Sequence, residues 1–158
     1  MPGTSEPIVI VLAEDNEGDR RLTAEMFAES RLANELHCVE DGAQLMDYLY
    51  HRGAYSDPAT APHPGLILLD LDMPHKDGHQ ALREIKADPV LSRIPVVVLT
   101  ISSEEADKLK SYDLGVVHYL RKPVNPKELI DVIQDFGFYW WEIVRREPRA
   151  NGLTERRG

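Results

Sequence analysis

Charged and hydroxyl side chains stand directly after the short apolar runs of this chain. Glu14 and Asp15 follow the first run, Asp70 follows the second and Thr100 follows the third. Lys122 comes after a weaker apolar stretch farther along. If these runs are parallel strands, their carboxyl ends meet at one edge of a sheet, where open parallel sheets bind their ligands. The spacing therefore predicts one cleft that holds three carboxylates, a hydroxyl and an ammonium.

Carboxylates gathered in one cleft need a compensating charge. They repel one another by about 4 kcal/mol per pair at ~4 Å and an effective dielectric constant of ~20. A hard divalent cation removes this repulsion, and an all-oxygen site with room for water suits Mg²⁺. Glu14, Asp15 and Asp70 are therefore candidate metal ligands.

Asp70 is also a candidate nucleophile toward phosphorus, because it stands at the end of its strand. The acyl phosphate that it would form carries negative charge that must be balanced. Mg²⁺ on one side, the Lys122 ammonium and a hydrogen bond from the Thr100 hydroxyl would balance it. The sequence contains no competing His or Cys nucleophile dyad.

The elements that must position these residues are short strands and helices in alternation. Ile8–Ala13, Leu66–Leu69 and Val96–Leu99 are apolar without alternation, which predicts strands buried on both faces of a parallel sheet. Weaker strands are predicted near Leu36–Val39 and Val116–Leu120. Segments with helical spacing separate the strands, so the fold class is α/β, a doubly wound sandwich.

Other segments give more local expectations. Asn125 followed by Pro126 predicts the N-cap and first position of the last helix. The insert Gly53–Gly65 is predicted to be an exposed loop. We divide the chain into a disordered N-terminus over residues 1–7, one domain over residues 8–146 and a polar tail over residues 147–158.

Composition limits the classes of partner. The chain has 158 residues, the size of one domain, with 27 acidic and 18 basic side chains and a net charge of −9. Such an acidic surface disfavours nucleic acid. The apolar runs are far shorter than the ~18 residues that span a membrane, and Met1–Pro7 lacks a signal peptide. We expect a soluble cytoplasmic protein, with the single Cys38 as a small buried hydrophobe in a strand.

The motifs around these residues resemble those of a two-component response regulator receiver domain. Val9–Asn16 (VIVLAEDN) is similar to the opening of that family, and Leu68–Gly78 (LLDLDMPHKDG) to its phosphoacceptor loop. Val97–Thr100 (VVLT) and Tyr119–Pro123 (YLRKP) match its switch hydroxyl, switch aromatic and lysine. The resemblance runs from about Ile8 to Phe136 and implies a flavodoxin-like five-stranded sheet of order 2-1-3-4-5.

The resemblance also implies a role for each matching residue. Asp70 would be the phosphoacceptor, assisted by Lys122 and Thr100. The implied Mg²⁺ ligands, some of them acting through water, are Glu14, Asp15, Asp70 and the backbone carbonyl of Asp72. Thr100 and Tyr119 would be the switch pair, and the Lys122–Pro123 peptide would be cis.

Finer features resemble the small response regulators of bacterial and cyanobacterial phytochrome kinases. These features are the Glu14-Asp15 pair, the insert before the third strand, the phrase Ser111–Gly115 (SYDLG) and the aromatic final helix. The resemblance implies a single-domain regulator that takes phosphoryl from a phytochrome-type histidine kinase. Such a protein is no enzyme in the ordinary sense, because it catalyses only its own phosphorylation and dephosphorylation.

Two features are expected to modify this behaviour. Ile101 follows Thr100 where most receivers carry a small residue, so we expect it to crowd the pocket mouth and slow access to the phosphoryl group. The extended final helix carries apolar residues on more than one face, which predicts a symmetric homodimer. Its predicted dimer residues are Tyr139, Trp140, Trp141 and Ile143.

Two alternatives remain open at the level of sequence. A Mg²⁺-dependent aspartyl-phosphate phosphohydrolase would share the strand-end Asp70 and would use Asp72 as its acid. Those enzymes hold substrate under a cap domain, however, and Gly53–Gly65 is too short to form one. A binding module that is not phosphorylated is disfavoured by the complete acidic pocket.

Overall fold

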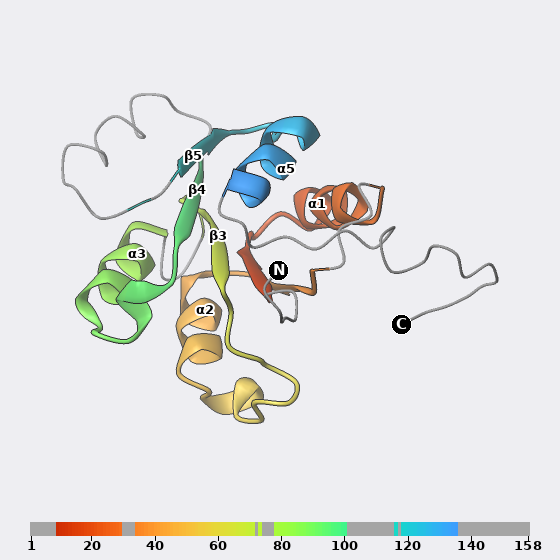
Figure 1. Cartoon of the computed structure of the whole chain (residues 1–158). Coiled ribbons are helices and arrows are strands. Elements are labelled where there is room, and N and C mark those ends of the chain that lie inside the picture. Colours follow the sequence, from red (N-terminus) through yellow and green to blue (C-terminus); the bar gives the residue numbers. More distant parts are fainter. Residues whose placement is uncertain are drawn as a thin grey trace, which may run out of the picture.

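The fold is a parallel sheet covered by helices on both faces (Figure 1). The computed structural model describes residues 9–29, 34–71, 73, 78–100, 116 and 118–135. Its five strands are parallel and lie in the order β2-β1-β3-β4-β5. Their bounds are β1 Ile10–Ala13, β2 Leu36–Val39, β3 Leu66–Asp70, β4 Val96–Thr100 and β5 His118–Arg121. The predicted fold class and strand order are confirmed.

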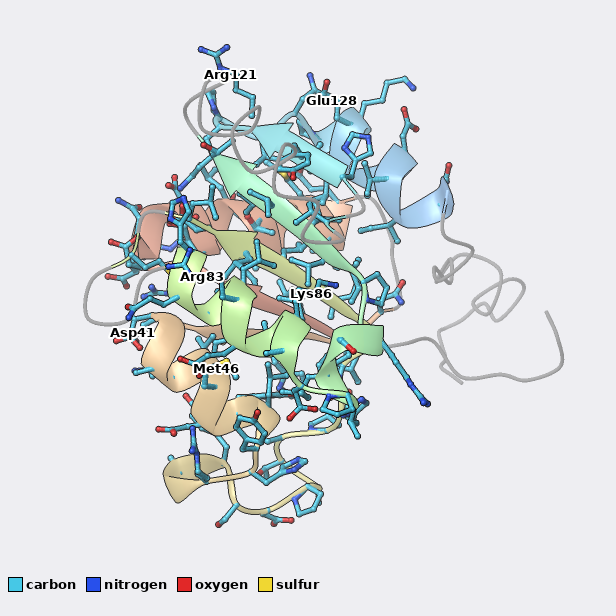
Figure 2. The ribbon with its side chains drawn as sticks, turned by 90° about the vertical axis from the view of Figure 1, so that its left-hand side faces the viewer. Asp41, Met46, Arg83, Lys86, Arg121 and Glu128 are labelled. Atoms are coloured by element: carbon cyan, nitrogen blue, oxygen red, sulfur yellow. The ribbon has the colours of Figure 1, made fainter. Side chains whose placement is uncertain are left out.

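The helices form the two outer layers. Helices α1 (Glu17–Glu29) and α5 (Pro126–Asp135) lie on one side of the sheet, and α2 (Gly42–Leu49) and α3 (Gly78–Ala87) lie on the other (Figure 1). Figure 2 looks onto the face covered by α2 and α3 and labels Met46 and Lys86 on these two helices. Short 3₁₀ turns at Gly53–Tyr55 (η1) and Leu91–Arg93 (η2) complete the described elements.

Burial on both faces explains why the central strands read as unbroken apolar runs. Every residue of β3 and β4 is buried. Alternate residues enter opposite layers of the core. Ile67, Leu69 and Val98 pack on the α2–α3 side. Leu68 and Leu99 pack on the α1–α5 side. The register pairs Asp70 with Leu99, so the carboxyl ends of the strands lie level with one another.

Local capping signals were read correctly where the structure describes them. Asn125 Oδ1 accepts hydrogen bonds from the backbone N–H groups of Lys127 at 2.8 Å and Glu128 at 3.2 Å, as predicted for an N-cap. Asp41, labelled in Figure 2, caps α2 in the same way through Gln44 N at 2.8 Å. These caps fix where α2 and α5 begin relative to the strands.

Two sequence interpretations need correction. Cys38 lies in strand β2 as expected, but its side chain is exposed, because β2 is an edge strand of the sheet. The insert before β3 is not simply an exposed loop. Ala61 within it is fully buried, and the hydroxyl of Tyr48 on α2 donates a 2.7 Å hydrogen bond to Pro62 O.

Some expectations fall outside the described residues. These are the helix predicted to follow Thr100, the final helix beyond Asp135, and the terminal segments 1–7 and 147–158. Within the part of the chain that the structure describes, no helix combines the length and the hydrophobicity needed to span a bilayer.

Candidate functional site

Three carboxylates meet at the carboxyl end of the sheet, as predicted. Glu14 follows β1, Asp15 stands next to it and Asp70 is the last residue of β3. One carboxylate oxygen of each lies within 4.8 Å of the other two. Glu14 and Asp70 are 1% and 2% exposed, whereas Asp15 is open to solvent. Two buried negative charges and one exposed one therefore share a small volume.

Lys122 follows the edge strand β5, and its side chain reaches this cluster. Its Nζ lies 2.9 Å from Glu14 Oε1 and 3.4 Å from Asp70 Oδ2. A third carboxylate, Asp19 Oδ2, lies 3.3 Å from the same nitrogen. Burial alone lowers the pKa of Lys122, but the hydrogen bond to Glu14 and the charges of Asp70 and Glu14 outweigh it and raise that pKa above its usual range. Lys122 therefore carries its positive charge at neutral pH.

The backbone after β5 holds Lys122 at this position. Its N–H donates a 2.8 Å hydrogen bond to the carbonyl of Thr100, the last residue of β4. The following peptide, Lys122–Pro123, is cis, as the resemblance implied. Thr100 is 3% exposed at the neighbouring strand end. Strands β4 and β5 thus deliver a hydroxyl and an ammonium to the same edge of the sheet as the carboxylates.

The turn from β1 into α1 fixes Glu14. Asn16 N donates to Glu14 Oε2 at 3.2 Å, and the Arg20 guanidinium donates to Glu14 O at 2.8 Å. Asn16 Oδ1 also accepts a 2.9 Å hydrogen bond from Asp19 N, which caps the first turn of α1. The first turn of α1 therefore positions both Glu14 and Asp19 against the Lys122 ammonium.

Close packing fixes the other side of Asp70. Gly78, the first residue of α3, donates from its N–H to Leu71 O at 3.1 Å. A Cβ at this glycine would lie 2.4 Å from Asp70 O and 2.5 Å from Leu71 Cα. Both are backbone atoms that cannot rotate away, so α3 can approach the end of β3 this closely because residue 78 lacks a side chain.

A pocket of about 280 Å³ opens beside the ammonium, between α1 and the segment after β5. Its polar lining comes from Glu14, Asp19 and Lys122. Leu22 lines it too, with 53% of its surface exposed. The remaining lining residues are Thr23, Met26, Leu99, Pro123 and Val124.

The remaining predicted site residues divide into two groups. Tyr119 is half-buried on β5 and packs against the core on the α2–α3 side, and burial raises the pKa of its phenol. The others lie outside the described residues. They are Asp72, Ile101, Tyr139, Trp140, Trp141 and Ile143.

Sequence reasoning missed the contribution of α1. Asp19, Asn16 and Arg20 all contact the core of the site, and none was a candidate. A signal was present, because Asp19 is a carboxylate in the first turn of the helix that directly follows the Glu14-Asp15 strand end. A carboxylate in the first turn after a strand end points back toward the same edge of the sheet.

The donor set fits a divalent cation. Three carboxylates, those of Glu14, Asp19 and Asp70, pair with the Lys122 ammonium, and Asp15 adds a fourth negative charge beside Glu14 and Asp70. The negative charge is in excess, and two of its carriers are buried. All three clustered ligands are oxygens, and Asp15 opens the cluster to solvent, so the set suits a hard ion that keeps some water, such as Mg²⁺.

Comparison with known proteins gives consistent results. Residues 10–134 match the family model of the response regulator receiver domain. The chain is 44% identical over 141 residues to response regulator Rcp1 of Synechocystis sp. (strain ATCC 27184 / PCC 6803 / Kazusa), covering 89% of this chain and 94% of Rcp1.

Solved structures show the same likeness. The bacteriophytochrome response regulator AtBRR superposes with a TM-score of 0.76 at 40% identity, covering 86% of this chain and 96% of that one. The Mn²⁺-bound form of Rcp1 gives a TM-score of 0.69 at 45% identity, with coverages of 86% and 96%. The phosphorylated cyanobacterial phytochrome response regulator RcpA gives 0.68 at 45% identity, with coverages of 83% and 91%.

Proposed function

This chain belongs to the response regulator receiver family, and on that premise we propose that it accepts a phosphoryl group on Asp70. One observation carries the assignment. Asp70 is a buried carboxylate at a strand end, clustered with Glu14 and Asp15 and 3.4 Å from the Lys122 ammonium. Among the described carboxylates only Glu14 shares this combination, and Asp70 differs from it in being the last residue of the central strand β3.

In the proposed reaction, a carboxylate oxygen of Asp70 attacks phosphorus. The new O–P bond forms as the bond from phosphorus to the donor breaks, and the donor leaves with the electron pair. Lys122 supplies positive charge to the phosphoryl oxygens, and the Thr100 hydroxyl supplies a hydrogen-bond donor. The chain catalyses only its own phosphorylation and the later hydrolysis of the acyl phosphate.

Mg²⁺ is the proposed cofactor. Glu14, Asp15 and Asp70 would hold it, directly or through water. Membership of the receiver family adds the backbone carbonyl of Asp72 as a further proposed ligand. When bound, it would neutralise charge that the carboxylates and the phosphoryl group bring together. The relative Rcp1 has a Mn²⁺-bound structure, which supports a divalent-ion site here.

The proposed output is a repacking of the β4–β5 side of the domain. Thr100 is the last residue of β4. Tyr119 on β5 is paired in register with Val98, which lies two residues before Thr100 on β4. We expect the Thr100 hydroxyl to move toward the phosphoryl group and Tyr119 to move further inward. Amide chemical shifts with and without beryllofluoride should then change along β5 as well as at Asp70. Shifts confined to the phosphoryl pocket would contradict this.

The proposed partner is a phytochrome-type histidine kinase. The proposal is supported by the similarity to Rcp1, AtBRR and RcpA, the last two of which are phytochrome response regulators. The predicted homodimer through the C-terminal helix also remains a proposal, because its residues lie outside the described part of the chain. Sedimentation at micromolar concentration tests it, and a monomer unaffected by Trp141→Ala would refute it.

The experiment that tests the function is phosphotransfer from such a kinase, autophosphorylated with ATP. We expect the full chain to take up phosphoryl in Mg²⁺ and to lose this ability in EDTA. Asp70→Asn should abolish uptake. Asp131→Asn, at an exposed carboxylate on α5, should leave it unchanged. Equal labelling of wild type and Asp70→Asn would overturn the proposal.

A further inference from the structure

We propose that Asp19 is a positioning residue that holds Lys122 in the resting site and must release it when Asp70 is phosphorylated. The inference deepens the function proposed above and rests on it. It starts from a contact that sequence reasoning did not foresee, the 3.3 Å ion pair between Asp19 Oδ2 and Lys122 Nζ.

The geometry makes Asp19 a competitor of any further acceptor on Asp70. An ammonium has three N–H donors, and Lys122 already faces three carboxylates, so a phosphoryl oxygen can accept from it only by displacing one of them. Glu14 is nearest at 2.9 Å, whereas Asp19 at 3.3 Å and Asp70 at 3.4 Å are almost equally distant. The proposed phosphoacceptor therefore shares its cation with a residue that has no part in the metal cluster.

The backbone of Asp19 is fixed, so its carboxylate stays within reach of the ammonium. Its N–H donates to Asn16 Oδ1 at 2.9 Å, and its carbonyl accepts from Thr23 Oγ1 at 3.0 Å. Its side chain is 42% exposed, so the ion pair with Lys122 costs Asp19 little desolvation. Because Asp19 is outside the cluster of Glu14, Asp15 and Asp70, a bound cation would not neutralise it directly.

Phosphorylation changes the balance between the two carboxylates. An acyl phosphate on Asp70 adds charge next to Lys122 and draws the ammonium toward the phosphoryl oxygens. Asp19 opposes this in two ways, because it keeps a share of the ammonium and repels the incoming anion. Both effects disfavour the phosphorylated state, so Asp19 favours the resting state and slows entry of the phosphoryl group.

The test compares two variants of the full chain that each remove one negative charge from the first turn of α1. Asp19→Asn removes the contact with Lys122. Glu17→Gln is the matched control, because Glu17 is 77% exposed and pairs with Arg21 at 3.5 Å, away from the ammonium. The loss of favourable charge at the helix N-terminus is the same in both. The measurements are beryllofluoride affinity and the acetyl phosphate labelling rate, at saturating Mg²⁺.

We expect Asp19→Asn to bind beryllofluoride and to be labelled roughly fivefold better than wild type, as the loss of a partly exposed ion-pair competitor allows. Glu17→Gln should change either quantity by less than about twofold. Asp19→Glu, which restores the carboxylate, should return both toward wild type. A change that is merely structural would not be reversed by Asp19→Glu.

Equal behaviour of Asp19→Asn and Glu17→Gln, or weaker binding by Asp19→Asn, would overturn the inference. The proposed function fails separately. If wild type is not labelled at Asp70 at all, the function is wrong and the inference falls with it. If wild type is labelled and the two variants match, the role of Asp19 alone is wrong.

Discussion

Lys122 donates a 2.9 Å hydrogen bond to Glu14, a residue 108 positions earlier in the chain. The contact joins the ends of β5 and β1, which are separated in the sheet by β4 and β3. The ammonium thus reaches across two intervening strands to a carboxylate that is 1% exposed. A single cation therefore links β5 to β1 and offsets part of the negative charge of the cluster.

Replacing that cation should destabilise the metal-free protein. In Lys122→Met, Glu14 and Asp70 remain buried without their counter-charge, so we expect the free energy of unfolding in EDTA to fall by about 2 kcal/mol. Urea denaturation measures this. Lys127→Met, at a side chain that is 83% exposed, is the control and should change little. Equal losses in the two variants would show that Lys122 has no special role.

Asp15→Asn should remove the response to Mg²⁺. In wild type, Mg²⁺ that binds the folded state should raise Tm, because ligand binding stabilises the form that binds it. Asp15 is the exposed member of the carboxylate cluster, so its neutralisation should not disturb folding. We expect an unchanged or higher Tm in EDTA and the loss of most of the Mg²⁺-dependent increase. A normal increase would exclude Asp15 as a ligand.

Gly78→Ala should damage both folding and phosphorylation. The added Cβ would meet Asp70 O at 2.4 Å and Leu71 Cα at 2.5 Å, so α3 must move away from the end of β3. We expect a loss of about 2–3 kcal/mol in the free energy of unfolding, together with slower labelling of Asp70. In Gly18→Ala the new atom meets a side-chain oxygen of Asn16 at 3.2 Å, which should cost much less. Similar costs for the two substitutions would contradict the packing at Gly78.

Tyr48 should make the fold sensitive to alkaline pH. Burial, with the nearby charge of Glu35, raises the pKa of Tyr48 to about 12. The unfolded chain releases this proton near pH ~10, so the stabilisation is complete below ~10 and is lost as the pH rises toward 12. Over this range we expect wild type to lose about 2 kcal/mol of its free energy of unfolding from this group.

The substitution that isolates this effect is Tyr48→Phe. It removes the hydrogen bond to Pro62 O and should therefore lower stability at neutral pH by about 1 kcal/mol. Between pH 10 and 12 its stability should fall less steeply than that of wild type. Parallel curves for the two proteins, measured by urea denaturation at each pH, would exclude Tyr48 as a source of the dependence.

The fold was predictable because its three central strands are buried on both faces. Leu66–Leu69 and Val96–Leu99 could be recognised from apolar continuity alone, and polar residues at their ends placed Asp70 and Thr100 at the site. The exposure of residues on the edge strand β2 was harder to predict from the sequence. The Leu36–Val39 segment was predicted only as a weaker strand, and its position at the edge of the sheet explains why Cys38 is exposed.

The missed parts of the site depend on tertiary approach. Leu22 and Phe27 are five residues apart and lie on different faces of α1, so Phe27 is buried while Leu22 lines the pocket. The ion pair between Asp19 and Lys122 joins α1 to the end of β5, and no local pattern encodes that distance. Strand-end residues could be predicted because the carboxyl ends of parallel strands meet at one edge of the sheet. No comparable rule predicts which helix residues reach that edge.

The central claim is that Asp70 carries the phosphoryl group, and chemical mapping of the acyl phosphate tests it most directly. The full chain is incubated with acetyl phosphate and Mg²⁺, reduced with borohydride and analysed by peptide mass spectrometry. Reduction should convert Asp70 alone, and EDTA or Asp70→Asn should abolish the product. Reduction at another carboxylate, or labelling that persists in Asp70→Asn, would contradict the account.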